Sequence, residues 1–533
     1  MRRLPALFGL IGIFGCSSPS SPPNFERSMS EPEPTPPGRT GSRSDANTAA
    51  SGGVGINLSA VSYYATQLPF SNLFMNRDVW LSTDGSTWDT EQASTIPVDA
   101  DGYALELPYE GLMMRASAFL PIHGDTFEMT WKGDGEFQIQ GPGYQLIEWL
   151  DSSLRFSVTS SLTDSVFIRI DRSEPGNHIR DIQIHGQRDY SSAFQDGLKG
   201  FGVLRFMDWG ATNHSPVRTW SERTTPKLGQ GSDHGVAIEH MIDTANAVGA
   251  HMWITVPHQA DDDYFERAAQ LIAERLDERL QVFVEYSNEN WNGIFSQVAW
   301  EQERGLAAGL DKFRTGETAE ETEFWAGIFF SVRRAGVLHD VFRRALGARA
   351  VTVLSGQSAN SGLSEALLTA YEDPRINPLG GKPDALAVAP YFGRLYRDPE
   401  DAEALTVARI LADAEQSIDE LVTEHTQANR EIADDHGVHL IAYEAGQHVL
   451  LAGGLENDDD LVQLMIDANR DPRMGELYRK AHRAWLSAGG ELIVYFNSCE
   501  APGKFGSWGA REYQDQPPSE APKWAALQSM VQE

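Results

Sequence analysis

The sequence is poor in cysteine and in basic residues. Only two cysteines, Cys16 and Cys499, occur in 533 residues, and Cys16 lies in a segment with the features of an export signal. We therefore expect no disulfide in the mature chain, so its stability depends on core burial. The 43 basic residues are outnumbered by 76 acidic ones, which gives a formal net charge of −33. This balance keeps a protein soluble and disfavours nucleic acid as a partner, because phosphate binding needs a basic surface.

Several catalytic motifs are also missing. The sequence contains no G-x-S-x-G elbow, no H-E-x-x-H, no P-loop and no dinucleotide-binding glycine motif, which disfavours serine esterases, zinc peptidases and nucleotide-binding enzymes. The run 261–263 is three aspartates, which favours a helix N-terminus over a calcium site. We predict neither a metal ion nor a cofactor, and we interpret Cys499 as a buried structural thiol.

The first 16 residues resemble a bacterial export signal. Arg2 and Arg3 precede a short apolar run from Leu7 to Phe14, which is too short to span a membrane. The run ends in Ile-Phe-Gly-Cys, which resembles a lipobox, so we predict that residues 1–16 are a lipoprotein signal peptide with Cys16 as the lipidated residue. An ordinary secretory signal is the alternative.

Residues 17–52 are rich in serine, proline and glycine and have few apolar residues to form a core. We predict a disordered tether. Ser17 follows the cysteine, and by resemblance to lipoprotein sorting in Gram-negative bacteria this residue favours the outer membrane or cell surface. Acyl chains alone would then attach the protein to the membrane.

Residues 93–190 show period-two alternation of apolar and polar residues, as in Phe127, Met129 and Trp131. Turn sequences separate these runs, for example Gly133-Asp134-Gly135. This pattern predicts an antiparallel β-sandwich. The sandwich either binds carbohydrate or only buttresses its neighbour.

Outside this insert, short apolar strands alternate with helical patterns, as in parallel β/α proteins. Helical spacing recurs, for example, in 264–276, 318–346 and 460–487. Counting strands predicts an α/β fold, a (β/α)₈ TIM barrel made of residues 53–92 and 195–533, with the sandwich inserted after its first strand. The eight strands begin near residues 56, 203, 253, 282, 351, 385, 440 and 492.

Two of these strands end in a glutamate. Val282-Phe283-Val284 leads to Asn288-Glu289 after strand four, and Leu440-Ile441-Ala442 leads to Glu444 after strand seven. Chemistry in such barrels is placed at the C-terminal strand ends, where two carboxyl groups can face each other across a sugar. Retaining glycoside hydrolysis needs two carboxyls about 5–5.5 Å apart. Glu285 is a rival candidate, but it is better explained as the partner of a buried arginine or lysine such as Arg205.

Polar and aromatic residues follow other strand ends and are candidates for substrate binding. An asparagine at position 288 can bond a sugar hydroxyl, and aromatic faces suit pyranose rings. The predicted substrate-binding residues are Asn288, Arg205, Trp209, His258, Trp291, Tyr391, His448 and Trp508.

The Asn288-Glu289 pair after strand four and Glu444 after strand seven resemble the clan A glycoside hydrolases, the cellulase-like superfamily of retaining (β/α)₈ enzymes. The resemblance covers about residues 54–92 and 195–533. It implies that Glu289 is the acid/base and Glu444 the nucleophile. Arg205 matches an arginine that supports the nucleophile in many members, and Tyr391 matches a tyrosine that hydrogen-bonds it. Trp508 lies near the place of a strand-eight tryptophan that forms the floor of the sugar site.

The sequence thus predicts a retaining glycosidase that cleaves β-glycosidic bonds of an extracellular polysaccharide. We expect a monomer that contacts the membrane only through its lipid. The alternative is a non-catalytic glycan-binding surface lipoprotein, in which the sandwich binds and the barrel is a scaffold.

Overall fold

The computed structural model describes residues 53–107, 112–119, 125–141, 143–158 and 165–532. The predicted signal peptide, the tether and Cys16 lie outside the described residues. Within these ranges, no helix has the length and apolarity that crossing a membrane requires.

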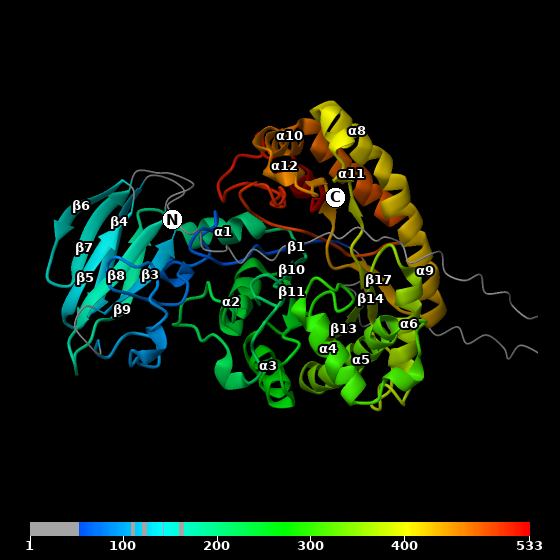
Figure 1. The fold of residues 1–533 in the computed structure, drawn as a ribbon, viewed down its shortest axis with the longest axis horizontal. Helices are drawn as coiled ribbons and strands as arrows, with labels where there is room; N and C mark the ends of the chain where they lie inside the picture. The colour runs from blue at the N-terminus through cyan, green and yellow to red at the C-terminus, as the bar shows by residue number, and fades with distance from the viewer. Residues whose placement is uncertain (1–52, 108–111, 120–124, 142, 159–164, 533) are drawn as a thin grey trace, which may run out of the picture.

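Eight parallel strands close into a barrel, which confirms the predicted fold and every predicted strand (Figure 1). First and last strands meet where Val54 pairs with Ile493. The strands follow the chain order β1 (Val54–Asn57), β10 (Val203–Arg205), β11 (His251–Val256), β12 (Val282–Tyr286), β13 (Ala350–Ser355), β14 (Ala385–Val388), β17 (His439–Ala442) and β20 (Ile493–Tyr495).

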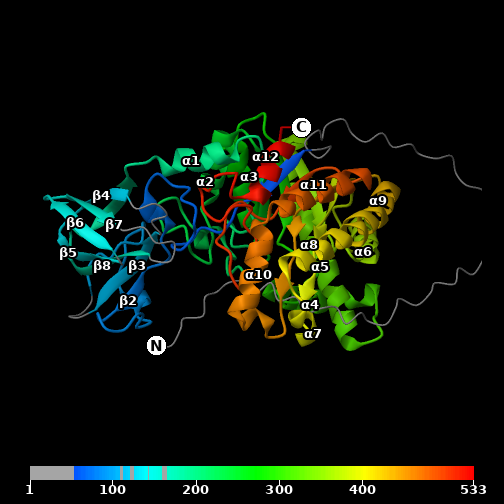
Figure 2. The same cartoon turned by 90° about the horizontal axis from the view of Figure 1, so that it is seen from above.

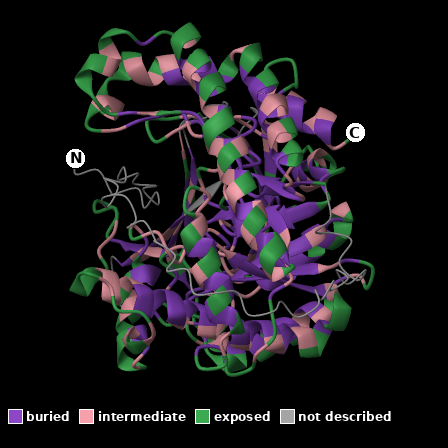
Figure 3. Ribbon diagram, turned by 90° about the vertical axis from the view of Figure 1, so that its right-hand side faces the viewer, coloured by how far each residue is buried: buried purple, intermediate pink, exposed green. Residues whose placement is uncertain are grey.

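Buried apolar side chains fill the barrel and the layer around it. Inside the barrel, Trp253 stacks on Phe283 and packs with smaller residues from the other strands. A larger cluster lies between the strands and the surrounding helices, and Figure 3 shows burial concentrated there. The helices are α1 (Tyr190–Leu198), α2 (Ile238–Val248), α3 (Asp262–Arg275), α4 (Ser296–Ala307), α5 (Ala319–Leu346), α6 (Ser361–Glu372), α7 (Pro399–Glu403), α8 (Val407–Ile418), α9 (His425–His436), α10 (Asp459–Arg470), α11 (Pro472–Ser487) and α12 (Pro522–Met530).

The predicted helix start at 261–263 is present. Asp261 is the N-cap of α3, and its Oδ1 accepts a hydrogen bond from the backbone N–H of Tyr264 at 2.8 Å. Asp262 and Asp263 form the first turn, where negative charge favours the helix dipole.

The insert is an antiparallel β-sandwich of two four-stranded sheets, which lies to one side of the barrel near α1 and α2 (Figure 2). Alternate residues of several strands face the core between the sheets, as with Phe127 and Met129. The unit begins earlier than residue 93, because Leu81 pairs with Arg115 and Trp80 joins the sandwich core. One sheet has the order β2 (Leu81–Thr83), β3 (Met113–Phe119), β8 (Val166–Ser173), β5 (Gly135–Gln140), and the other β6 (Tyr144–Trp149), β7 (Ser153–Val158), β4 (Asp125–Lys132), β9 (Arg180–Gly186).

Helices α4 and α5 approach each other closely because glycines lie at their contact. A Cβ atom added to Gly305 of α4 would lie 2.1 Å from the carbonyl oxygen of Ala326 in α5. A Cβ added to Gly327 of α5 would lie 3.1 Å from the backbone nitrogen of Gln302. Any side chain at Gly305 therefore forces the helix backbones apart.

We expect Gly305→Ala to destabilise the protein by roughly 1–3 kcal/mol. This range already includes the gain of up to about 1 kcal/mol that alanine brings through its higher helix propensity. Urea unfolding followed by tryptophan fluorescence measures this change. Gly293→Ala is the matched control, since a Cβ there meets nothing within 4 Å. Equal midpoints for the two variants would contradict the proposed role of this contact.

Candidate active site

A buried arginine joins the C-terminal ends of four barrel strands. Arg205, the last residue of β10, donates from Nη1 to Glu444 Oε1 at 2.8 Å and to Asn57 Oδ1 at 3.0 Å. Its Nε and Nη2 donate to Glu285 Oε2 at 3.2 and 2.9 Å, and Nη2 donates to Asn288 Oδ1 at 2.8 Å. A guanidinium has five N–H donors, and all five are used here. A buried charge is tolerated only when it is paired in this way.

These bonds change the predicted role of Arg205. Its side chain is fully buried and has no donor left for a ligand, so the prediction that it binds substrate is wrong. Its bond to Glu444 matches the supporting role that the resemblance implied.

Glu285 belongs to this ion-pair network, as the alternative interpretation of the sequence expected. Besides Arg205, it accepts a hydrogen bond from Trp253 Nε1 at 2.8 Å and another from the Ser355 hydroxyl. Both of its carboxylate oxygens are therefore engaged inside the barrel. This arrangement gives Glu285 a structural role.

Glu444 lies two residues beyond β17 and is buried. Its Oε1 accepts from Arg205, and its Oε2 accepts from the Tyr391 hydroxyl at 3.0 Å. Burial raises the pKa of Glu444, whereas the charge of Arg205 and the bonds from Tyr391 and Arg205 oppose that rise. Each oxygen thus has one donor that fixes the orientation of the carboxyl group.

Glu289 lies three residues beyond β12 on a turn with unusual backbone angles. Ser287 has φ +59° and Glu289 has φ +44°, a conformation that costs about 1–2 kcal/mol per non-glycine residue. The turn brings Glu289 Oε1 to the hydroxyl of Tyr443 at 3.0 Å and Oε2 to Asn292 Nδ2 at 2.8 Å. Burial and the charge of Glu444 raise the pKa of Glu289 to about 7.

The two glutamates interact electrostatically but have different surroundings. Glu444 has a guanidinium beside it, whereas Glu289 is bonded only to neutral donors. Because the charge of one raises the pKa of the other, they titrate in two linked steps. The guanidinium of Arg205 favours the ionised form of Glu444, whereas burial and the charge of Glu444 raise the pKa of Glu289 to about 7.

Three predicted substrate-binding side chains gather beside Glu444. The ring of His448 lies 5.5 Å from the rings of both Tyr391 and Trp508, and Tyr391 lies 6.0 Å from Trp508. Burial lowers the pKa of His448 to about 4, so its imidazole is neutral at pH 7. Although Trp508 is distant from β20 in sequence, it reaches this cluster and packs on Phe496. The cluster borders Glu444 through the hydroxyl of Tyr391.

Two predicted sugar contacts are wrong because the side chains are inside the protein. Trp209 is 0% exposed and stacks on Phe194 in the layer between strands and helices. His258 is 1% exposed, and its ring packs edge-to-face on Trp300. In both cases an aromatic or histidine residue after a strand turns toward the core instead of the strand-end face.

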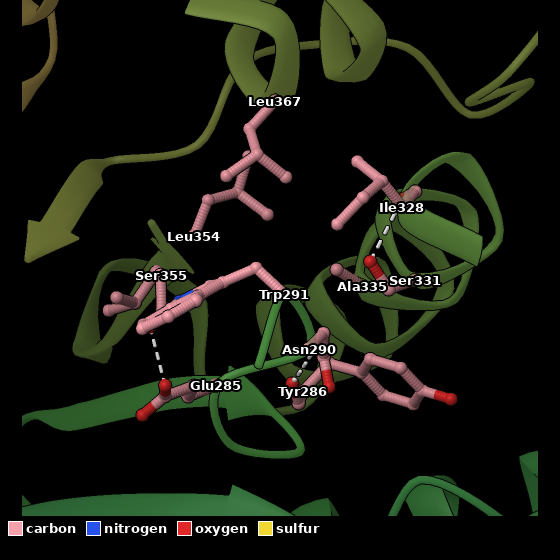
Figure 4. A pocket seen from close by; sticks show the side chains of 11 residues that line it. Glu285, Tyr286, Asn290, Trp291, Ile328, Ser331, Ala335, Leu354, Ser355 and Leu367 are labelled. Carbon is pink, nitrogen blue, oxygen red and sulfur yellow. Dashed lines mark hydrogen bonds between the residues drawn. The ribbon is translucent and has the colours of Figure 1, made fainter. Parts of the chain in front are cut away.

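Trp291 and Asn288 stay predicted substrate contacts, and the structure shows their surroundings. Trp291 lines a small cavity near the ends of β12 and β13, together with Leu354 and residues of α5 (Figure 4). Asn288 is almost fully buried and spans Arg205 and Asn213, to which its Nδ2 donates at 3.1 Å. An amide nitrogen carries two hydrogens, so the second N–H of Asn288 Nδ2 can donate to a ligand.

Sequence patterns missed other residues of this region. Tyr443 directly precedes Glu444, and the sequence pattern gives no sign that its hydroxyl bonds Glu289. Asp208 follows β10, and Glu500 follows β20. Burial, together with the charges of Glu444 and Glu500, raises the pKa of Asp208 to about 8. The signal for Asp208 was its position just past a strand end.

Two other sequence predictions concern metal ions and Cys499. In the part of the chain that the structure describes, no group of three or more His, Cys, Asp or Glu side chains is arranged to hold a metal ion. Cys499 is buried against Thr66, and burial raises the pKa of its thiol to about 11. The thiol is therefore unreactive at neutral pH, as expected for a structural residue.

Comparison with known proteins gives solved structures only, since no family model and no curated protein matches the sequence. A GH51 arabinofuranosidase from Xanthomonas axonopodis pv. citri is 14% identical over 59% of this chain and 60% of its own, with a TM-score of 0.33. A GH5-4 broad specificity endoglucanase from an uncultured bacterium is 14% identical over 63% and 83%, with a TM-score of 0.34. An exo-β-1,4-mannosidase from Opitutaceae bacterium strain TAV5 is 10% identical over 65% and 56%, with a TM-score of 0.36.

The names of these structures are those of glycoside hydrolases. This chain spans less than two thirds of the arabinofuranosidase and of the mannosidase. At these identities and TM-scores, the assignment of the barrel rests on the strand pairing of the chain itself.

The hydroxyl of Tyr443 stabilises ionised Glu289 and so lowers its pKa. We expect Tyr443→Phe to raise the upper titration step of the pair by about one unit. Carbon NMR of protein labelled at the glutamate carboxyl measures both steps. Tyr391→Phe is the matched control, because it removes the equivalent hydroxyl from Glu444 and should move the lower step. If Tyr443→Phe shifted only the lower step, the assignment of the upper titration step to Glu289 would be contradicted.

Proposed function

We propose that the protein is a retaining glycoside hydrolase that cleaves β-glycosidic bonds of an extracellular polysaccharide, with Glu289 as acid/base and Glu444 as nucleophile. The pair of linked carboxyls after strands four and seven carries this proposal. One carboxyl is held by Arg205 and Tyr391, which favour its ionised form, while the pKa of the other is about 7. Paired carboxyls with different pKa values are what double displacement needs.

In the first step, Glu289 gives its proton to the glycosidic oxygen as the bond from that oxygen to the anomeric carbon breaks. An oxygen of Glu444 attacks the anomeric carbon from the opposite face and forms an ester. The bonds from Arg205 and Tyr391 hold Glu444 in position before the attack. Positioning of this kind removes much of the entropic cost of the step.

In the second step, Glu289 is a carboxylate and takes a proton from water. The oxygen of that water attacks the anomeric carbon, the ester bond breaks, and Glu444 leaves as a carboxylate. Two inversions give net retention of the anomeric configuration. Tyr443 and Asn292 hold the carboxyl of Glu289 in both steps.

The aromatic cluster of Tyr391, His448 and Trp508 supports a carbohydrate substrate. Rings beside the nucleophile give a sugar an apolar surface, while the hydroxyl of Tyr391 bonds Glu444. Pockets that recognise small polar ligands combine apolar walls with a few placed polar groups in this way.

The test is a screen of residues 53–533 against β-glucans, mannans, xylans and galactans. We expect cleavage of one polymer class, with the product anomer retained in early NMR spectra. Glu444→Gln should lower the rate by at least about 10³-fold, because the covalent route is lost. Glu289→Gln should lose about 10²–10⁴-fold on the polymer, but much less on aryl glycosides whose leaving groups need no proton.

Asp435→Asn is the control for these variants, because this exposed carboxyl lies on α9, just before the N-terminal end of β17, and should change nothing. Activity of Glu444→Gln equal to wild type would overturn the mechanism. Retention of a polymer on an affinity gel without cleavage would favour the glycan-binding alternative. A product with inverted anomeric configuration would mean that Glu444 acts as a general base on water and not as the nucleophile.

We also propose that the protein is exported and attached to the outer membrane or cell surface by lipid on Cys16. The apolar run that ends at a cysteine and the Ser-Pro-rich segment after it support this location. Cys16→Ser should abolish labelling by radioactive palmitate and move the protein from the membrane fraction to the soluble one. Unchanged membrane association would refute the anchor.

A further inference from the structure

One outer face of the sandwich carries an exposed tryptophan beside a row of hydrogen-bonded polar side chains. We propose that this face, the outer face of the sheet β2-β3-β8-β5, binds an uncharged stretch of the polysaccharide, with Trp88 as the stacking surface and Gln138 and Gln140 as hydrogen-bonding groups. The choice of ligand rests on the proposed function. The sandwich then holds the polymer that the barrel cleaves.

The strand pairing brings these residues together on one face. Buried and exposed residues alternate along β5, and its exposed residues Gln138 and Gln140 face away from the sandwich core. In the neighbouring strand β8, their partners are Arg169 and Phe167. The partner of Arg169 in β3 is Arg115. Adjacent strands lie about 5 Å apart, so one oligosaccharide segment can contact all three strands.

Trp88 lies in the loop between β2 and β3 and is held against this face. The Cζ atom of Arg115 lies 4.1 Å from the centroid of the Trp88 ring, and Phe167 packs on that ring edge-to-face, with 5.3 Å between centroids. Arg115 Nη2 also donates to the carbonyl oxygens of Thr87, at 3.0 Å, and of Trp88. Trp88 nevertheless remains 37% exposed. A ring that is fixed before binding loses little freedom when a sugar stacks on it.

The polar side chains beside these rings form a chain of hydrogen bonds. Gln140 Nε2 donates to Gln138 Oε1 at 3.3 Å, and Gln138 Nε2 donates to Asp171 Oδ2 at 2.9 Å. Arg169 Nε donates to the other oxygen of Asp171 at 2.6 Å. Each amide nitrogen has a second hydrogen, and each amide oxygen has two lone pairs. Because a hydroxyl both donates and accepts, oriented donors and acceptors of this kind suit the hydroxyls of a sugar.

The charges on this face are balanced, which favours an uncharged ligand. Arg169 forms an ion pair with Asp171, and their side chains are only 14% and 21% exposed. Arg115 is bonded to the loop that carries Asp84 and Asp89. A charged polymer would have to compete with these carboxylates or guanidinium groups for their partners, whereas a neutral polymer would not.

The outer face of the other sheet has a different composition along β4 and β7. Its outward residues there are small or charged and carry no ring: Thr126, Glu128, Thr130, Lys132, Ser153, Arg155 and Ser157. This is the usual composition of a solvated sheet face. The combination of rings and amides therefore distinguishes the Trp88 face.

The Trp88 face lies on the same side of the molecule as the strand-end face of the barrel. Seen from above, the sheet β2-β3-β8-β5 lies on the side of the sandwich that corresponds to α7 and α10 on the barrel, and α1 lies on the other side (Figure 2). Helices α7 and α10 belong to the segments that follow the C-terminal ends of β14 and β17. A long polymer can therefore contact the sandwich face and reach Glu289 and Glu444.

The experiment measures retention in native gels that contain one β-glucan, mannan, xylan or galactan of the screen. Residues 53–533 carry Glu444→Gln, so that the polymer is not cleaved. We expect Trp88→Ala to weaken retention about 3–10-fold, and Gln138→Ala/Gln140→Ala to weaken it as well. Added salt should not weaken retention of the unchanged face.

Matched controls come from other parts of the sandwich. Trp149 is 51% exposed on the edge strand β6, and Gln183 is exposed on β9 of the other sheet. Trp149→Ala and Gln183→Ala should therefore be retained like the unchanged protein. With the active protein, the Trp88 and glutamine variants should raise KM for the polymer several-fold and leave kcat unchanged. Their kcat/KM on an aryl glycoside, which is too small to reach the sandwich, should also stay unchanged.

Retention of Trp88→Ala and of the glutamine variant equal to that of the unchanged protein would overturn the inference, even where the polymer is cleaved. Failure of every polymer to retain the unchanged protein would overturn it too. Retention that falls steeply with salt would overturn the uncharged ligand, because salt screens ionic contacts. The glutamine variant decides the question if Trp88→Ala does not fold. Absence of cleavage, with retention lost in these variants, would remove the proposed function and support the inference.

Discussion

The geometry of the strand-end face depends on the burial of one positive charge. Arg205 is surrounded by Glu285, Glu444, Asn57 and Asn288, which come from three strands other than its own. If Arg205 were removed, the carboxylates of Glu285 and Glu444 would remain buried without a cation, and an uncompensated buried charge costs about 3–5 kcal/mol. The hydrogen bond from Arg205 to Glu444 therefore does two things: it helps to compensate the buried guanidinium, and it fixes the position of the Glu444 carboxyl group.

The difference between the two glutamates follows from this arrangement. Of Glu289 and Glu444, only Glu444 contacts the guanidinium, because Glu289 lies beyond the strand end on a turn with positive φ at two residues. Because Glu289 is bonded only to neutral donors, burial and the charge of Glu444 raise its pKa to about 7. Two residues of the same type thus acquire different protonation through their neighbours.

The sequence predicted the barrel well because the signal is local. Apolar strands and amphipathic helices alternate, and the polar residues at strand ends can be recognised from position alone. All eight strands, the sandwich and the pairing of Glu285 with Arg205 are present.

Side-chain direction beyond the strand ends could not be predicted in the same way. Trp209 and His258 face the core because loop residues follow no fixed period. Trp508 reaches the aromatic cluster because its loop returns to the end of β20, where the Asn497 N–H donates to the carbonyl oxygen of Trp508 at 3.2 Å and the Trp508 ring packs on Phe496. Tyr443 and Asp208 were overlooked because their roles depend on partners that are distant in sequence.

The position of the inserted sandwich has a consequence for folding. The first barrel strand is followed by the sandwich and only then by the second, while the last strand must close against the first. Ser59 and Ser498, which are hydrogen-bonded across that seam, lie 439 residues apart in sequence. Contacts of such high contact order form late, because a long loop must be closed before they stabilise anything. Until the C-terminal strand has emerged from synthesis or translocation, β1 remains an unpaired edge, so the complete chain is needed before the strand-end face can assemble.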